Sequence, residues 1–207
     1  MKDTCVYIIE DDQMQADLLS AILESYGYQS KAYGNPKAFL SEFRNDHNCV
    51  ILSDIMMPDM TGLDLLNRMS ETGYLPPLIL MTAYSTVPVV KEALQGGAFD
   101  FLLKPISITD VGPLLEKAVA HEKLHRERYK KRLDIQHSIA QLTAREKQIY
   151  DLLLQGLSTK EMEARLFISP RTIETHCRNV LAKFDVSSIK DLLVKVLPLA
   201  AEKNGVS

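Results

Sequence analysis

Five polar residues that could bind a metal ion and a phosphoryl group stand at the ends of short apolar runs in the first half of the chain. In order they are Glu10, Asp11, Asp54, Thr82 and Lys104. Each follows or ends a stretch of strand length; Asp54, for example, closes the run 49–54. If these stretches are parallel strands, the polar groups meet at the carboxyl ends of the strands, where doubly wound sheets bind their ligands.

Three of the five residues are carboxylates, and like charges held together without a counter-charge repel one another. A hard divalent cation, Mg2+ or Mn2+, relieves that repulsion because it prefers oxygen ligands. Lys104 adds a second positive charge and Thr82 a hydroxyl donor, which predicts a phosphoryl pocket with one carboxylate as nucleophile. Singly, an Asp after a strand is more often a helix cap or turn residue, so the prediction depends on the conjunction of four strand ends.

The elements that must position these residues alternate between strand and helix. The apolar and amphipathic patterns predict strands at 5–9, 28–33, 49–53, 77–81 and 99–103, and helices at 13–26, 36–44, 62–71, 87–95 and 108–120. Five strand–helix repeats favour a doubly wound α/β fold, with a five-stranded parallel sheet covered on both faces.

Length and charge divide the chain into two parts. At 207 residues it exceeds the usual size of one domain. Residues 1–121 carry 8 Lys and Arg against 16 Asp and Glu, whereas residues 122–207 carry 16 against 11. The acidic half suits a metal or regulatory site and the basic half a polyanion partner. Neither a membrane span nor a signal peptide is evident, and three scattered cysteines suit a reducing cytosol, so we expect a cytoplasmic protein.

The boundary between the halves is predicted at a charged segment. Residues 122–139 contain no Gly or Pro, which favours a helical linker between a domain at 1–121 and a domain at 140–207. The string His121-Glu122-Lys123-Leu124-His125 matches the H-E-x-x-H pattern of zinc proteases. No third ligand is evident and the surroundings are charged, so a solvated helix face is the favoured interpretation.

The basic half predicts four short helices with clear starts. Thr143 with Glu146, and Ser158 with Glu161, form capping boxes. A helix over 170–184 carries an apolar stripe on one side and, on the opposite face and its flanks, polar residues that suit DNA: Arg171, Thr172, Glu174, Thr175, Arg178, Asn179 and Lys183. With Lys160 on the preceding helix, this pattern favours a helix-turn-helix.

The first half shares five motifs, in the same order, with a known family. They are EDD at 10–12, Asp54 with MPDMTG at 57–62, TA at 82–83, GAFDF at 97–101 and KP at 104–105. On these motifs, residues 4–120 resemble a response-regulator receiver domain of two-component signalling, which has a flavodoxin-like fold.

This resemblance implies a role for each matching residue. Asp54 is implied as the phosphoacceptor, with Mg2+ held by Glu10, Asp11, Asp54 and the backbone carbonyl of Met56. Lys104 is implied to contact the phosphoryl group, and Thr82 with Phe101 to form a switch pair.

Three positions of the receiver half carry the features particular to this chain. Glu10 stands where many members of the family have Asp, and acidic character is kept. The resemblance implies that Met56 and Tyr84, two residues beyond Asp54 and Thr82, occupy positions that border the path of hydrolytic water; both are bulky and neither is a natural base. A slowly self-hydrolysing acyl phosphate is predicted.

The second half is similar to a family as well. Its motifs are LTARE at 142–146, GLSTKE at 156–161, ISPRTIETH at 168–176 and NVLAKF at 179–184. With these, residues 140–200 resemble the LuxR-type helix-turn-helix domain of the FixJ and NarL regulators. The resemblance implies that Glu174, Thr175 and Arg178 face base edges. Glu163 and Ile189 depart from the usual residues without breaking the motif.

Together the two resemblances imply a transcriptional response regulator that is not a metabolic enzyme. The implied partners are a sensor histidine kinase, double-stranded DNA, a second copy of the chain on activation, and RNA polymerase. Two alternatives remain open from the residues alone: a metal-dependent phosphatase with a basic accessory tail, and a phosphorylation-independent DNA-binding protein with a vestigial receiver.

Overall fold

The computed structural model describes residues 2–83, 91 and 93–203. The chain divides into two compact units, Met1–Glu127 and Arg128–Ser207, and each is described by itself. Most of the helix predicted at 87–95, together with Tyr84, lies outside the described residues. Within the described ranges, none of the helices combines the length and apolar character needed to cross a bilayer.

The first unit is built on a five-stranded parallel sheet with strand order β2-β1-β3-β4-β5. The strands are β1 Cys5–Ile9, β2 Gln29–Tyr33, β3 Cys49–Asp54, β4 Leu78–Thr82 and β5 Asp100–Leu103. Strands β3 and β4 are buried along their whole length, as expected for central strands covered on both faces. The order reverses between β1 and β3, which confirms the doubly wound α/β prediction.

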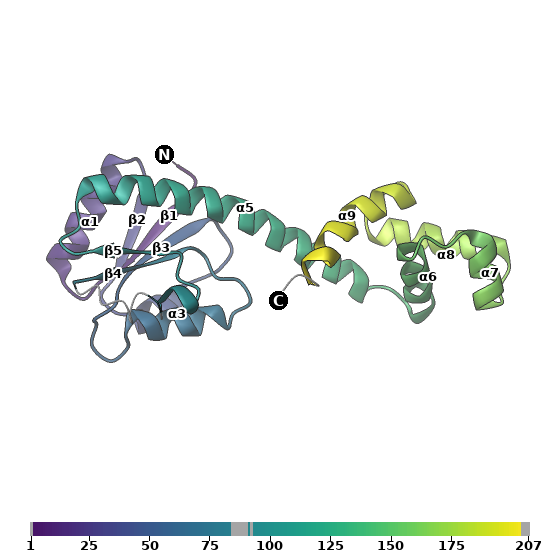
Figure 1. The fold of residues 1–207 in the computed structure, drawn as a ribbon, viewed down its shortest axis with the longest axis horizontal. Helices are drawn as coiled ribbons and strands as arrows, with labels where there is room; N and C mark the ends of the chain where they lie inside the picture. Colours follow the sequence, from purple (N-terminus) through teal and green to yellow (C-terminus); the bar gives the residue numbers. More distant parts are fainter. Residues whose placement is uncertain (1, 84–90, 92, 204–207) are drawn as a thin grey trace. The chain divides into compact units, whose positions relative to one another are not determined.

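Helices cover both faces of this sheet. They are α1 Gln13–Ser25, α2 Pro36–Glu42, α3 Gly62–Ser70 and α5 Ile108–Ala140. Figure 1 shows α1 and α5 on one face and α3 on the other, and each face has its own apolar core. The helix starts have local causes: Asp12 and Asn35 cap α1 and α2, and Thr61 forms a capping box with Asp64 at α3.

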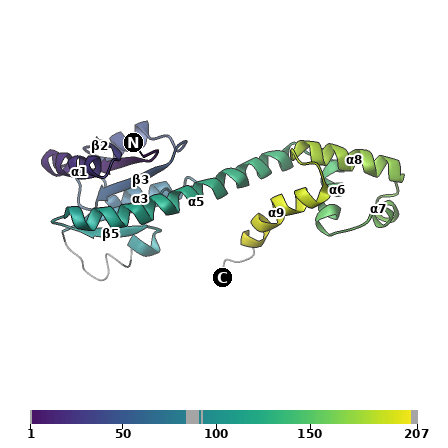
Figure 2. The same cartoon turned by 90° about the horizontal axis from the view of Figure 1, so that it is seen from above.

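Helix α5 runs without interruption over 33 residues, and Figure 2 shows its unbroken course. The predicted helical extension of 108–120 is therefore observed. Gly112 allows the ring of Tyr26 to pack on α5, since a Cβ there would lie 2.4 Å from that ring. The Tyr26 hydroxyl donates to the carbonyl of Ile108 at 2.8 Å, which ties the end of α1 to the start of α5.

The second unit contains the end of α5 and four helices: α6 Ala144–Leu154, α7 Thr159–Leu166, α8 Pro170–Lys183 and α9 Ile189–Lys203. The predicted capping boxes at Thr143 and Ser158 are both present, and Ser169 caps α8. The predicted apolar stripe of α8 is the core: Ile173, Val180 and Phe184 are fully buried. The fold thus leaves the opposite face of α8 exposed.

Candidate functional site

Strand geometry brings the predicted polar residues to one edge of the sheet. Glu10 follows β1 and its N–H donates to the carbonyl of Tyr33 on β2. Asp54 is the last residue of β3. Lys104 follows β5, and its N–H donates to the carbonyl of Thr82 at the end of β4. All four groups therefore lie at the carboxyl ends of parallel strands.

The ammonium group of Lys104 joins two carboxylates at this edge. Its Nζ lies 2.7 Å from Asp54 Oδ2 and 2.7 Å from Glu10 Oε2. Burial raises the pKa of Glu10, and the nearby Asp54 charge raises it further, while the bond from Lys104 opposes the rise. Burial lowers the pKa of Lys104, but its bonds to both carboxylates outweigh this effect and the pKa is raised. The lysine is thus held as a cation between two acidic groups.

Three carboxylates at the same edge offer the oxygen donors that a divalent cation requires. Glu10, Asp11 and Asp54 each place one oxygen so that all three lie within 4.8 Å of one another. Asp11 is exposed, whereas Glu10 and Asp54 are buried. Hard oxygen ligands at this spacing, with one face open to water, fit Mg2+, which keeps several waters when it binds protein.

Met56 and Gly62 shape the backbone around Asp54. The Met56 N–H donates to Asp54 Oδ1 at 3.2 Å, while its side chain is 69% exposed. Gly62 starts α3, and its N–H donates to the carbonyl of Ile55 at 3.0 Å. A Cβ on Gly62 would lie 2.3 Å from the Asp54 carbonyl oxygen. Sequence reasoning gave Gly62 no role of its own, because the close approach comes from a strand and a helix eight residues apart.

The two residues of the implied switch pair lie on neighbouring strands. Thr82 ends β4 and is buried. Phe101 lies on β5 opposite Leu80, is partly buried, and packs against the core that α2 and α3 share with the sheet.

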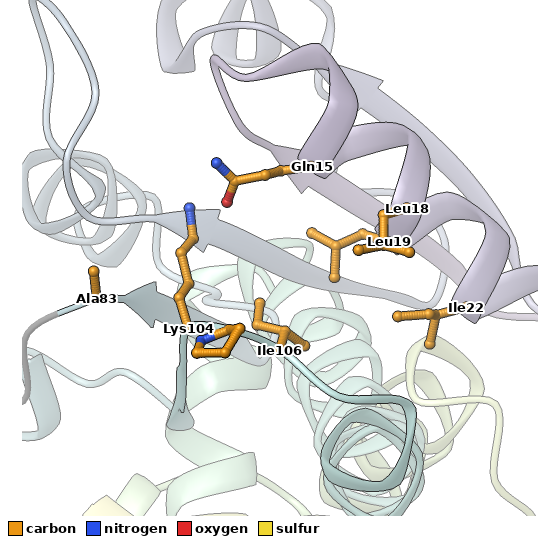
Figure 3. Close-up of a pocket in the computed structure, with 8 residues that line it drawn as sticks. Gln15, Leu18, Leu19, Ile22, Ala83, Lys104 and Ile106 are labelled. Atoms are coloured by element: carbon orange, nitrogen blue, oxygen red, sulfur yellow. The ribbon is translucent and has the colours of Figure 1, made fainter.

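A pocket of about 480 Å³ opens beside Lys104, on the α1 side of the sheet edge. Figure 3 shows Leu18, Leu19 and Ile22 of α1 along one wall and Ile106 facing them, with Lys104 and Gln15 extending toward each other. Met14 and Leu18 on α1 are exposed, as is Ile108 at the start of α5. The sheet edge that holds Lys104 is therefore flanked by an accessible apolar surface.

A buried ion pair lies at the start of β3, at the end of the strand opposite Asp54. Glu122 is 0% exposed and accepts from Arg126 Nε at 2.6 Å, from the hydroxyl of Tyr74 at 2.7 Å and from the N–H of Cys49 at 3.3 Å. Arg126 also donates to the side chain of Asn45 at 2.8 Å. The network fastens α5 to the first residue of the strand that ends at Asp54.

The predicted solvated helix face at residues 121–125 is confirmed for four of the five residues and is wrong for Glu122. His121 and His125 are exposed and their rings stack at 4.2 Å, but Glu122 between them is turned into the protein. The glutamate of the H-E-x-x-H string is committed to Arg126, so it is not placed to serve as the base of a zinc protease. The Arg four residues later predicts the ion pair, but such pairs are ordinarily on the helix surface, so the sequence carried no signal for the burial of Glu122.

In the second unit, the predicted DNA-contacting residues are mostly exposed on α8. Arg171, Thr172, Glu174, Thr175, Arg178 and Asn179 are exposed, and Lys160 is exposed on α7. Lys183 is different: its Nζ bonds to the Glu146 carboxylate and to the carbonyl of Gln141 at 2.9 Å. The hydrogen bond from Lys183 is the largest cause of a lowered pKa of Glu146, and the bond from the Thr143 N–H lowers it further, to about 2. Lys183 thus joins the end of α8 to the start of α6.

An α/β unit with a lysine-bridged acidic edge, followed along the chain by a helix-turn-helix unit, defines the class of two-domain signalling regulators. Residues 6–116 match the response regulator receiver domain, and residues 140–196 match the luxR family of bacterial regulatory proteins.

Relatives match over nearly the whole chain. The chain is 32% identical over 188 residues to the transcriptional regulatory protein FixJ of Bradyrhizobium diazoefficiens, covering 91% of this chain and 92% of that protein. It is 30% identical over 193 residues to the response regulator protein TmoT of Ectopseudomonas mendocina, covering 93% and 87%.

Solved structures of response regulators have the same fold. The crystal structure of full-length FixJ from B. japonicum gives a TM-score of 0.57 at 31% identity, covering 95% of this chain and 97% of that one. The response regulator StyR gives a TM-score of 0.81 at 24% identity, covering 95% and 100%.

The chain belongs to the FixJ-type response regulators of two-component systems, which join a receiver domain to a luxR-family helix-turn-helix domain. The two resemblances found in the sequence are therefore confirmed. The protein is a phosphorylation-regulated transcription regulator and not a metabolic enzyme. Its receiver domain implies a sensor kinase as partner, and its helix-turn-helix domain implies DNA binding.

Proposed function

We propose that Asp54 accepts the phosphoryl group from a sensor histidine kinase and that the acyl phosphate controls DNA binding by α8. The observation that carries this proposal is the placement of Lys104 Nζ 2.7 Å from Asp54 Oδ2 at an edge that also holds Glu10 and Asp11. An attacking carboxylate, a fixed cation and a set of metal-binding oxygens are then within reach of one phosphorus atom.

The chemistry follows from these contacts. Asp54 attacks phosphorus, so that an O–P bond forms as the bond from phosphorus to the donor's imidazole nitrogen breaks. Mg2+ or Mn2+, held by Glu10, Asp11, Asp54 and the Met56 carbonyl, would neutralise charge on the phosphoryl oxygens. Lys104 binds another of these oxygens. The Thr82 hydroxyl and the Phe101 ring change position when the phosphoryl group is bound. The receiver thereby promotes its own phosphorylation and dephosphorylation.

Labelling with acetyl phosphate and Mg2+ tests the phosphoacceptor. The wild-type protein should gain one acid-labile phosphoryl group, and Asp54→Asn should gain none. Asp59→Asn is the matched control, because Asp59 is exposed, lies five residues further on, and pairs only with exposed Lys37 among the contacts described. Equal labelling of Asp54→Asn and wild type would contradict the assignment.

The kinase is proposed to approach through the apolar pocket between α1 and Lys104, since this pocket lies beside the acceptor. Leu18→Arg should slow phosphotransfer from a kinase that phosphorylates the wild type, yet leave labelling by acetyl phosphate unchanged. Leu94→Arg is the control, because Leu94 is also exposed but lies outside the pocket. Phosphotransfer to Leu18→Arg at the wild-type rate would contradict the docking role.

The output is proposed to be sequence-specific binding of double-stranded DNA by α8 in the major groove. Glu174, Thr175 and Arg178 face base edges, where Arg suits guanine and Glu accepts from cytosine. Phosphates are contacted by Lys160, Arg171, Thr172 and Asn179. The predicted contact Lys183 is left out of this set, because its ammonium is bonded to Glu146 and to the Gln141 carbonyl. Arg178→Ala should reduce discrimination between promoter sequences, whereas Lys160→Ala should weaken binding to all sequences and reduce its salt dependence.

Phosphorylation is proposed to pair two copies through the receiver, which would set the spacing of two DNA half-sites. The bound dimer would then act on transcription through RNA polymerase. Sedimentation of wild type and Asp54→Asn, each with and without acetyl phosphate, tests the first step. A monomer under all four conditions would contradict it. Transcription in vitro with purified polymerase tests the second.

A further inference from the structure

The turn between α7 and α8 holds Phe167 in a backbone conformation that phenylalanine rarely adopts. Its φ is 53° and its ψ 43°, and its N–H donates to the carbonyl of Glu163 at 2.9 Å to close α7. Helices commonly end on Gly or Asn here, because a Cβ crowds the neighbouring carbonyl in the left-handed region. The other described non-glycine residues with positive φ are Asp59 and Asp185, a type that tolerates this region.

The Phe167 side chain makes no core packing contact that would offset the strained backbone. Phe167 is 90% exposed, whereas Leu166 and Ile168 on either side pack against the core of the unit. A single exposed apolar residue is ordinary on a relaxed backbone. Here exposure and an unfavourable φ occur at one residue, and residues with a strained backbone cluster at ligand-binding and switch sites. Neither the core nor the turn accounts for an aromatic ring at this position.

The turn is braced, so the ring is presented from a fixed place. Arg145 donates to the carbonyl of Leu166 at 3.0 Å, just before Phe167. Ser169, two residues after Phe167, caps α8 and accepts from the Thr172 N–H at 3.2 Å. The exposed ring therefore lies next to the helix end that carries the proposed DNA contacts Arg171 and Thr172.

We propose that the Phe167 ring is a DNA contact that packs against the deoxyribose of the strand bordering the groove entered by α8. The inference rests on the proposed DNA-binding function. Deoxyribose presents the same apolar surface in every sequence, so the contact adds affinity without discriminating between bases. It neutralises no phosphate, so it leaves the number of released counterions unchanged.

Fluorescence anisotropy with a labelled duplex of mixed sequence, over a range of salt concentrations, tests the contact in the full chain. Phe167→Gly should weaken binding about tenfold at every salt concentration. The slope of log K against log salt should stay at the wild-type value. Arg171→Ala should instead reduce that slope. The thermal midpoint of Phe167→Gly should equal or exceed that of the wild type, because glycine relaxes the turn.

Each other outcome overturns the proposal in a recognisable way. If Phe167→Gly binds as wild type while Arg171→Ala binds weakly, the DNA-binding function stands and the ring is not a contact. Wild-type DNA affinity with lost transcription would assign the ring to a protein partner. A lowered thermal midpoint would make it a structural residue. Failure of the wild type itself to bind any duplex would overturn the DNA-binding function as well.

Discussion

The carbonyl oxygen of Asp54 lies 2.3 Å from the position that a Cβ on Gly62 would occupy. Gly62→Ala must therefore displace the start of α3 from the end of β3. We expect a loss of about 1–3 kcal/mol in the free energy of unfolding, as for other overpacked sites. Labelling by acetyl phosphate should slow because the Asp54 backbone moves. Thermal unfolding and labelling rates measure both effects.

Gly34→Ala is the control for that substitution. A Cβ on Gly34 has no neighbour within 4 Å, so stability and labelling should remain near the wild-type values. Wild-type behaviour of Gly62→Ala would show that α3 adjusts without disturbing Asp54.

The Lys104 ammonium lies in the negative electrostatic potential of Glu10 and Asp54, which would also attract a divalent cation. Lys104→Met removes a positive charge that lies 2.7 Å from both Asp54 and Glu10. Mg2+ should therefore bind several-fold more tightly, measured by titration calorimetry. Lys37→Met removes an exposed lysine paired with Asp59 and should change the affinity little. Weaker Mg2+ binding by Lys104→Met would mean that the lysine holds the carboxylates in their binding arrangement.

Removing only one partner of the buried Glu122–Arg126 ion pair should destabilise the fold. Arg126→Met leaves the Glu122 carboxylate buried without its counter-charge, so a loss of about 3–5 kcal/mol in the free energy of unfolding is expected. Urea unfolding followed by circular dichroism measures it. The double variant Glu122→Met/Arg126→Met should lose less than Arg126→Met alone, because no charge remains buried. A larger loss in the double variant would refute this account.

The pH dependence of the second unit should report the Glu146–Lys183 bond. The folded pKa of Glu146, about 2, lies below its usual value near 4.5. Its stabilisation is therefore fully present above about pH 4.5 and is lost as the pH falls toward 2. Glu146→Gln should cost about 1.5–3 kcal/mol at neutral pH, and its difference from wild type should shrink on acidification. Exposed Glu163 supplies the control, Glu163→Gln, for which a constant small difference is expected.

The acyl phosphate is predicted to be long-lived. Met56 is 69% exposed beside Asp54 and offers no base to a water molecule. Met56→Asn and Tyr84→Glu should both shorten the half-life of the phosphorylated protein, measured as loss of label after removal of acetyl phosphate. Equal half-lives would show that neither side chain limits the access of water.

Most of the fold could be predicted from local sequence patterns. The apolar runs that become β1, β3 and β4, and the capping boxes at Thr143 and Ser158, act within a few residues of themselves. The apolar stripe of α8 likewise follows from helical spacing. These features could be predicted because the physical cause and its effect lie close together in the chain.

By itself, then, the sequence determined the alternation of strands and helices, the acidic and basic halves, and the set of polar residues at the strand ends. The tertiary structure decided what those residues touch. The bridge from Lys104 to Glu10 and Asp54 and the burial of Glu122 against Tyr74 and Cys49 join segments distant in the chain. Such contacts depend on the order of strands and the packing of helices, which no local pattern encodes.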